Sequence, residues 1–111
     1  MVIIYNNVHI ILLGDNMCTS ITMEEFLKLS SINIIDLRSN QSYNNNHIPN
    51  AVNIPFEKLI ISPNSYMDKS IKYFIYCQKG LVSKKACQIL SGLGYKVVNI
   101  LGGYEEWILK K

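Results

Sequence analysis

The sequence predicts a single α/β domain with a central parallel sheet of four to five strands and helices on both faces. Short apolar runs rich in β-branched and aromatic residues recur along the chain, and segments with helical spacing separate them. Such runs are typical of parallel strands that are buried on both faces. At 111 residues, with 49% hydrophobic and 17% charged residues, the chain can bury one core and is too short for two.

The apolar stretch 1–17 stands apart from the regular pattern that follows it. It lacks the basic leading region and small-residue cleavage site of a signal peptide. Two interpretations remain: an extra strand, or a translation start at Met17. The second rests on Gly14 to Met17, which can be encoded as GGA GAT AAT ATG, a purine-rich ribosome-binding sequence just before an ATG. We therefore assign 1–17 as an extra N-terminal segment and 18–111 as the domain.

The first half of the domain alternates helices with short strands. Thr22 to Glu25 form a capping box, which predicts a helix over Met23 to Leu29 with Phe26, Leu27 and Leu29 toward the core. Pro49 disfavours helix at Ile48 and indicates a turn. The remaining elements expected here are a strand at 33–38, a short helix at 42–46, a strand at 52–54 and a weak helix at 56–60.

The second half contains the central strand, at 73–76, which ends on Cys77. Gly80 permits a tight loop, and a helix follows that begins near Ser83 and has Gly94 as its C-cap. A last strand at 96–101, a Gly-Gly turn and a helix at 104–109 complete the chain, with Trp107 and Ile108 expected to cover the sheet.

Cys77 has the features of a reactive cysteine. It lies between the carboxyl end of a strand and the amino end of a helix, where loop N–H groups have no other partner. These amides, the positive end of the helix and the nearby ammonium groups favour a thiolate over a thiol. The ammonium groups belong to Lys79, Lys84 and Lys85. The pattern indicates a cysteine enzyme that handles an anion.

The composition argues against several other classes. A net charge of +3, a pI of about 8.8 and a single arginine do not suit a nucleic-acid partner. No run approaches the ~18 apolar residues of a membrane span. Three cysteines without C-x-x-C spacing indicate neither a disulfide framework nor a metal site, so we expect a reduced, cytoplasmic setting.

Four motifs occur in order between Ser20 and Leu109, and together they resemble a single-domain rhodanese, a sulfurtransferase of the rhodanese-like family. The resemblance implies the small rhodanese-like fold. The motifs are Ile35-Asp-Leu-Arg38, His47-Ile-Pro-Asn-Ala-Val-Asn-Ile-Pro55, Tyr76-Cys-Gln-Lys-Gly80 and Leu101-Gly-Gly-Tyr-Glu-Glu-Trp107.

The resemblance implies a persulfide relay with no metal or organic cofactor. Cys77 would take the outer sulfur of a small anionic donor such as thiosulfate and pass it to a thiophilic acceptor, either cyanide or a cellular or protein thiol. The N–H groups of the loop would hold the persulfide anion. The substrate-binding residues implied are Gln78, Lys79, Gly80, Leu81 and Val82.

Three positions in or next to the loop separate alternative functions. Related phosphatases carry an arginine six positions after their cysteine, and here that position is Ser83, so the bidentate phosphate clamp is missing. Many active rhodaneses have arginine or threonine where this chain has Val82. Val82 therefore favours an alternative, a sulfur-carrier or docking module that a protein partner loads and that acts little on free thiosulfate. Lys79 resembles the cationic loop positions of family members that use thiosulfate more than the neutral loops of those that use 3-mercaptopyruvate.

Other polar residues have two interpretations each. In the family, the residues matching Asp36 and Arg38 usually support the scaffold, although their place at a strand end also allows contact with substrate. His47 is expected to make a structural hydrogen bond rather than act as a general base, because a stabilised thiolate needs no base. Cys87 could resolve an oxidised Cys77, but core packing is the favoured role.

Overall fold

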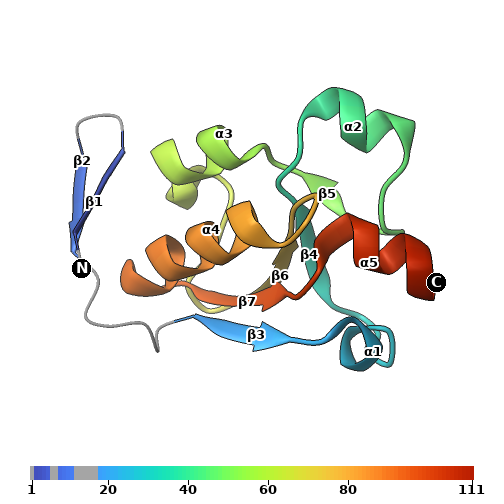
Figure 1. The fold of residues 1–111 in the computed structure, drawn as a ribbon. Coiled ribbons are helices and arrows are strands. Elements are labelled where there is room, and N and C mark those ends of the chain that lie inside the picture. Colours follow the sequence, from blue (N-terminus) through green and yellow to red (C-terminus); the bar gives the residue numbers. More distant parts are fainter. Residues whose placement is uncertain (1, 6–7, 12–17) are drawn as a thin grey trace.

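The computed structural model describes residues 2–5, 8–11 and 18–111 and shows a five-stranded, all-parallel sheet (Figure 1). The order across the sheet is β3-β7-β6-β4-β5. Strand β6, which immediately precedes Cys77, is therefore the central strand. The bounds are β3 Thr19–Ile21, β4 Asn33–Asp36, β5 Val52–Asn53, β6 Lys72–Tyr76 and β7 Lys96–Ile100.

Helices cover both faces of the sheet, as the sequence predicted (Figure 1). Helices α3 and α4 pack on one face, and α1 and α5 pack on the other. Parallel neighbours require crossover connections, and these connections supply the helices. The bounds are α1 Met23–Phe26, α2 Asn40–Asn45, α3 Phe56–Ile61, the 3-10 helix η2 Pro63–Ser65, α4 Leu81–Gly92 and α5 Gly103–Lys110.

Alternation along β6 divides the core into two clusters. Tyr73, Ile75 and the following Cys77 face α3 and α4, whereas Phe74 and Tyr76 face α1 and α5. The first cluster is completed mainly by the helix residues Leu59, Ile60, Ala86, Ile89 and Leu90, and the second by Met23, Phe26 and Trp107. Because side chains alternate between the two faces of a strand, Cys77 points to the same face as Ile75, toward the start of α4.

Helix α1 is shorter than predicted. The capping box forms, with Thr22 Oγ1 accepting the Glu25 N–H at 3.1 Å, but the helix ends at Phe26. Leu27 and Leu29 are each 42% exposed and lie outside the core. The physical reason is the turn that follows, where Ser31 adopts a positive φ of 56° and redirects the chain into β4. Ile108, at 39% exposed, likewise covers less of the sheet than expected.

The N-terminal segment contains two short strands, where the sequence suggested one extra strand. Strand β1 Val2–Tyr5 pairs antiparallel with β2 Val8–Ile11, and this pair forms a sheet separate from the five-stranded one (Figure 1). Met17, the alternative start, lies outside the described residues. The assignment of residues 1–17 as an extra segment stays a prediction.

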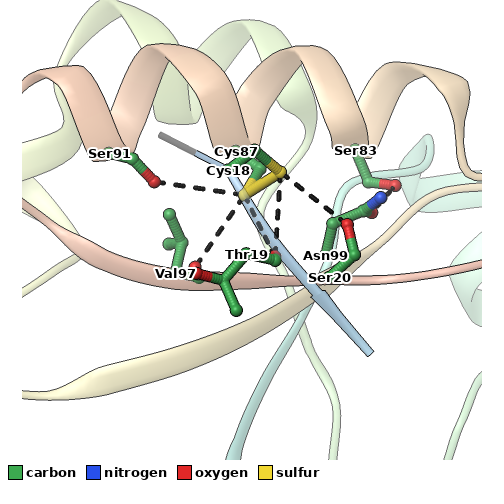
Figure 2. Close-up of a disulfide and its surroundings, with 8 residues drawn as sticks. All are labelled: Cys18, Thr19, Ser20, Ser83, Cys87, Ser91, Val97 and Asn99. Carbon is green, nitrogen blue, oxygen red and sulfur yellow. Dashed lines mark hydrogen bonds between the residues drawn. A yellow bond between two sulfur atoms is a disulfide. The ribbon is translucent and has the colours of Figure 1, made fainter. Parts of the chain in front are cut away.

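Cys18 and Cys87 form a disulfide, which corrects the expectation that the cysteines are unpaired (Figure 2). Their Cα atoms are 5.3 Å apart although 69 residues separate them in the sequence, a Cα separation usual for such a bond. The pairing follows from topology. Strand β3 lies beside β7, and α4 packs over β7, so the residue preceding β3 reaches the middle of α4.

No helix in the described part of the chain has the length and apolar character needed to cross a membrane.

Candidate functional site

Cys77 is held at the point where β6 turns into α4. Cys77 is only 5% exposed. Its Sγ accepts hydrogen bonds from two backbone N–H groups. The Gly80 N–H donates at 3.1 Å and the Ser83 N–H at 3.2 Å. Both donors belong to the loop or to the first turn of α4, where helical N–H groups have no intrahelical partner. Two backbone N–H donors are therefore directed at one buried sulfur atom, the arrangement by which backbone loops commonly bind anions.

Gly80 makes the turn around the sulfur possible. Its φ is +98°, a left-handed conformation that other residues rarely adopt, and it immediately precedes α4. A Cβ at this position would also lie 3.0 Å from the backbone nitrogen of Gly102. Gly80 is thus needed both for the backbone conformation and for the close approach of the turn before α5.

The predicted loop residues differ in their exposure to solvent. Gly80 is buried and contributes its N–H, whereas Gln78, Lys79, Leu81 and Val82 are exposed. With Cys77, these four line a hollow of about 220 Å³. Its wall includes Leu81 and Val82, which are 75% and 44% exposed. The mouth of the site is therefore largely apolar, with Lys79 as the cation among its lining residues.

Helix α5 fixes the other side of the loop. The Tyr104 N–H donates to the Cys77 carbonyl at 2.9 Å, and the Glu105 N–H donates to the Gln78 carbonyl at 3.1 Å. Gly103, with a φ of +60°, allows this contact, because a Cβ there would lie 2.4 Å from the Cys77 carbonyl oxygen. The Gly-Gly turn therefore positions the backbone of Cys77 as well as reversing the chain.

Asp36 and Arg38 form a buried ion pair beside the loop. The Arg38 Nη2 donates to Asp36 at 2.8 Å and to the carbonyl of Asn46 at 2.6 Å. Arg38 also reaches the loop, since its Nη1 donates to Gln78 Oε1 at 3.4 Å, and its guanidinium lies over the Tyr104 ring at 4.0 Å. These contacts favour the scaffold interpretation, with Arg38 linking β4 to the loop and to α5.

The ion pair is extended by Tyr76, the last residue of β6. Its hydroxyl donates to Asp36 and accepts the Ile48 N–H at 3.1 Å. Burial, and then the hydrogen bond to Asp36, raises the pKa of Tyr76, so its hydroxyl remains a protonated donor at neutral pH. The turn motif that begins at His47 is thereby tied to β6, the strand that immediately precedes Cys77.

His47 makes the expected structural contacts. Its Nδ1 lies 2.9 Å from the carbonyl oxygen of Tyr43, and the two rings stack with their centroids 3.8 Å apart.

The sequence analysis missed the role of Ser83 and the partner of Cys87. Ser83 had served only to argue against a phosphatase, yet it is fully buried, its N–H binds Cys77 Sγ, and its Oγ lies 3.3 Å from that sulfur. The available signal was its position at the start of a helix six residues after the cysteine. Cys87 is bonded to Cys18, so it is not a thiol available to Cys77. Among the described cysteines, Cys77 is the free one.

Within residues 2–5, 8–11 and 18–111, no three His, Cys, Asp or Glu side chains are grouped as metal ligands.

Together, the parallel sheet and the buried cysteine that accepts two backbone N–H groups define a small α/β domain with a single buried sulfur at the junction of a strand and a helix. The family model described as "Rhodanese-like domain" matches residues 22–110. The chain therefore belongs to the rhodanese-like family, as the four sequence motifs predicted, and its relatives are sulfurtransferases.

Three known proteins illustrate the similarity. The thiosulfate sulfurtransferase GlpE of Coxiella burnetii is 34% identical over 87 residues, which cover 75% of this chain and 78% of that protein. A putative sulfur carrier protein of Bacillus subtilis, YrkF, is 31% identical over 78 residues, covering 69% of this chain and 42% of that one. The crystal structure of a rhodanese-like domain protein from Staphylococcus aureus superposes with a TM-score of 0.70 at 31% identity, covering 80% of this chain and 90% of that one.

The Gly103 contact gives a testable prediction. In a Gly103→Ala variant the new methyl group must displace the Cys77 carbonyl, so we expect the rate of Cys77 alkylation by iodoacetamide to change at least several-fold. We also expect a loss of stability of about 1–2 kcal/mol from the left-handed backbone.

Gly94→Ala is the matched control. Gly94 has a similar positive φ of +96°, but a Cβ there would meet only the Lys69 side chain, at 3.7 Å. This variant should lose stability without altering Cys77. Equal alkylation rates for the two variants would show that Gly103 does not position the cysteine.

Proposed function

We propose that this protein moves a sulfane sulfur from thiosulfate, or a similar donor, to a thiophilic acceptor such as cyanide or a thiol, through a persulfide on Cys77. The observation that carries the proposal is the pair of N–H groups, from Gly80 and Ser83, that donate to the buried Cys77 Sγ. These donors stabilise a sulfur anion without a metal ion.

The first half-reaction forms one sulfur–sulfur bond and breaks another. The Cys77 thiolate attacks the outer sulfur of thiosulfate, and the bond between the two sulfurs of the donor breaks. Its electron pair leaves with sulfite, and the persulfide anion of Cys77 remains. Two negative charges leave on sulfite and one stays on the persulfide, so charge and electrons balance.

The second half-reaction returns the enzyme to its starting state. Cyanide or a thiolate attacks the outer persulfide sulfur, and Cys77 departs as a thiolate. Dividing the transfer into these two steps replaces one difficult reaction with two easier ones. The same loop amides assist both steps, because Cys77 is the nucleophile in one and the leaving group in the other.

The outer sulfur of the persulfide would be held by the first turn of α4. The N–H groups of Leu81 and Val82 are the first two of that helix and have no intrahelical acceptor. The positive end of the helix dipole adds to their effect. The anionic end of the donor would then meet Lys79 in the hollow beside Cys77.

A second candidate function is a sulfur-carrier or docking module that a protein donor loads. The observation that favours it is the apolar mouth of the site, where Val82 stands in place of the arginine or threonine of many active rhodaneses. An apolar rim suits a protein surface better than a small sulfonate-like anion. The Bacillus relative named as a putative sulfur carrier is consistent with this candidate.

We place the reaction in the cytoplasm, where reduced thiols are available as acceptors. The Cys18–Cys87 disulfide is unusual for that compartment. Fractionation of cells that express the native gene tests the location: recovery of the protein in the cytoplasmic fraction would agree with it, and recovery outside the cytoplasm would contradict it.

The direct test is an assay of thiosulfate and cyanide with a Cys77→Ser control. The wild type should produce thiocyanate, and the variant should fall to the background rate, because a serine hydroxyl cannot form the persulfide. Cys87→Ala serves as a second control and should retain activity. Thiocyanate production that survives in Cys77→Ser would refute the proposed nucleophile.

Changing Val82 separates the two candidate functions. In the thiosulfate enzyme, Val82→Arg should raise kcat/KM for thiosulfate about tenfold, because one charge-assisted hydrogen bond to the donor is worth roughly 1.5 kcal/mol. Leu109→Arg adds the same charge at a remote, 78% exposed site and should have no effect. Unchanged, negligible use of thiosulfate by Val82→Arg would favour loading by a protein donor.

A further inference from the structure

A chain of buried polar side chains continues below Cys77, on the side away from the solvent-exposed loop. The Ser83 Oγ lies 3.3 Å from Cys77 Sγ and donates to Asn99 Oδ1 at 2.6 Å. Ser83 comes from the first turn of α4 and Asn99 from β7, and Figure 2 shows the two side chains next to each other between helix and sheet. Ser83 and Asn99 both have no exposed surface.

Asn99 occupies a position where an apolar residue would be expected. It lies in β7 beside Ile75 of β6, and the preceding residue on the same face, Val97, belongs to the core. Its Nδ2 is buried and has no hydrogen-bond partner within the described part of the chain. Burying an unpartnered amide N–H is unfavourable, because the group loses its hydrogen bonds to water and gains none in return. Packing alone therefore does not explain why an asparagine lies under the cysteine.

An amide differs from an apolar side chain in being able to present either a donor or an acceptor to the same neighbour. Rotation of the Asn99 amide by half a turn exchanges Oδ1 and Nδ2 without changing the shape of the side chain. The group turned away from Ser83 has no partner to lose, and an unpartnered buried carbonyl is tolerated better than an unpartnered N–H. The serine hydroxyl can likewise rotate to donate in either direction.

We propose that Ser83 and Asn99 are positioning residues that stabilise the Cys77 thiolate from beneath the loop by reversing the direction of their hydrogen bonds. In the neutral state the thiol donates to Ser83 Oγ, and the serine hydroxyl donates to Asn99 Oδ1. When the thiol proton leaves to solvent, the hydroxyl rotates to donate to the sulfur, and the turned Asn99 Nδ2 donates to the serine oxygen. The number of hydrogen bonds in the chain is unchanged.

This inference rests on the proposed function, in which Cys77 acts as a thiolate twice. The fixed N–H groups of Gly80 and Ser83 can only donate, so they favour the anion at all times. The Ser83 hydroxyl differs, because it accepts from the thiol and donates to the thiolate. It thus keeps the sulfur in one position in both states.

The test measures the pH dependence of Cys77 alkylation in the full chain. Digestion with trypsin after Lys72 and Lys79 isolates Cys77 from the other two cysteines, so mass spectrometry of peptide 73–79 follows this thiol alone. The charged groups near the loop are unchanged in every variant, so they do not contribute to the differences. They are Lys79, Lys84 and Lys85 on the loop and α4, Arg38 and Asp36 at the end of β4, and Glu105 on α5.

Three variants define the expected result. Ser83→Ala should raise the midpoint of the pH dependence by about one pH unit, because it removes a hydrogen bond to a charged sulfur. Asn99→Leu keeps the serine hydroxyl and should shift the midpoint less, in the same direction. The double variant should match Ser83→Ala, since Asn99 acts only through Ser83 and the two changes are then not additive.

Ser91→Ala is the matched control, because Ser91 lies on the same helix and makes no contact with Cys77. It should leave the midpoint unchanged. A merely structural role would lower the unfolding free energy of the variants without moving the midpoint, and an unchanged midpoint in folded Ser83→Ala would overturn the proposal. Additive shifts in the double variant would overturn it as well. If Ser83→Ala does not fold, the midpoint of Asn99→Leu decides alone.

Alkylation requires no sulfur donor, so the two proposals can fail separately. A shifted midpoint together with no thiosulfate activity would contradict the proposed donor and leave the role of Ser83 intact. Normal activity with an unshifted midpoint would contradict the role of Ser83 alone.

Discussion

The candidate site depends on the hydrogen bonds that two backbone N–H groups donate to the sulfur of Cys77. A buried thiolate is costly unless donors replace the water that it loses, and here the Gly80 and Ser83 N–H groups do so at 3.1 and 3.2 Å. Both are available because a helix begins at Leu81 and leaves its first N–H groups without intrahelical partners. The catalytic proposal thus follows from the way a strand meets a helix.

The rest of the fold holds this junction in place. The turn before α5 fixes the Cys77 carbonyl through the Tyr104 N–H, and only glycine at position 103 permits the contact. From the other side, Arg38 joins the end of β4 to Gln78 and to the Tyr104 ring. The motifs that are separated in the sequence therefore meet around one loop, which explains why they are recognisable together although each is weak alone.

Much of the fold and the position of Cys77 could be predicted from the sequence. The features that could not be predicted depend on which strands and helices lie next to each other. The short β-branched runs indicated a parallel sheet, and the strand–cysteine–glycine–helix order placed Cys77, because both are local patterns. The Cys18–Cys87 disulfide depends on β3 lying beside β7, which no local pattern specifies. Asn99 was missed for the same reason, since only the packing of α4 on β7 brings it to Ser83. The end of α1 at Phe26 depended on the turn at Ser31.

The measurement that tests the account most directly is the intact mass of cyanide-treated protein before and after thiosulfate, with Cys77→Ser alongside. We expect the wild type alone to gain the mass of about one sulfur atom and to lose it again on adding cyanide. A gain of equal size on Cys77→Ser would contradict the account, because the sulfur would then be carried elsewhere. No gain on the wild type would contradict thiosulfate as the donor and would direct attention to a protein donor.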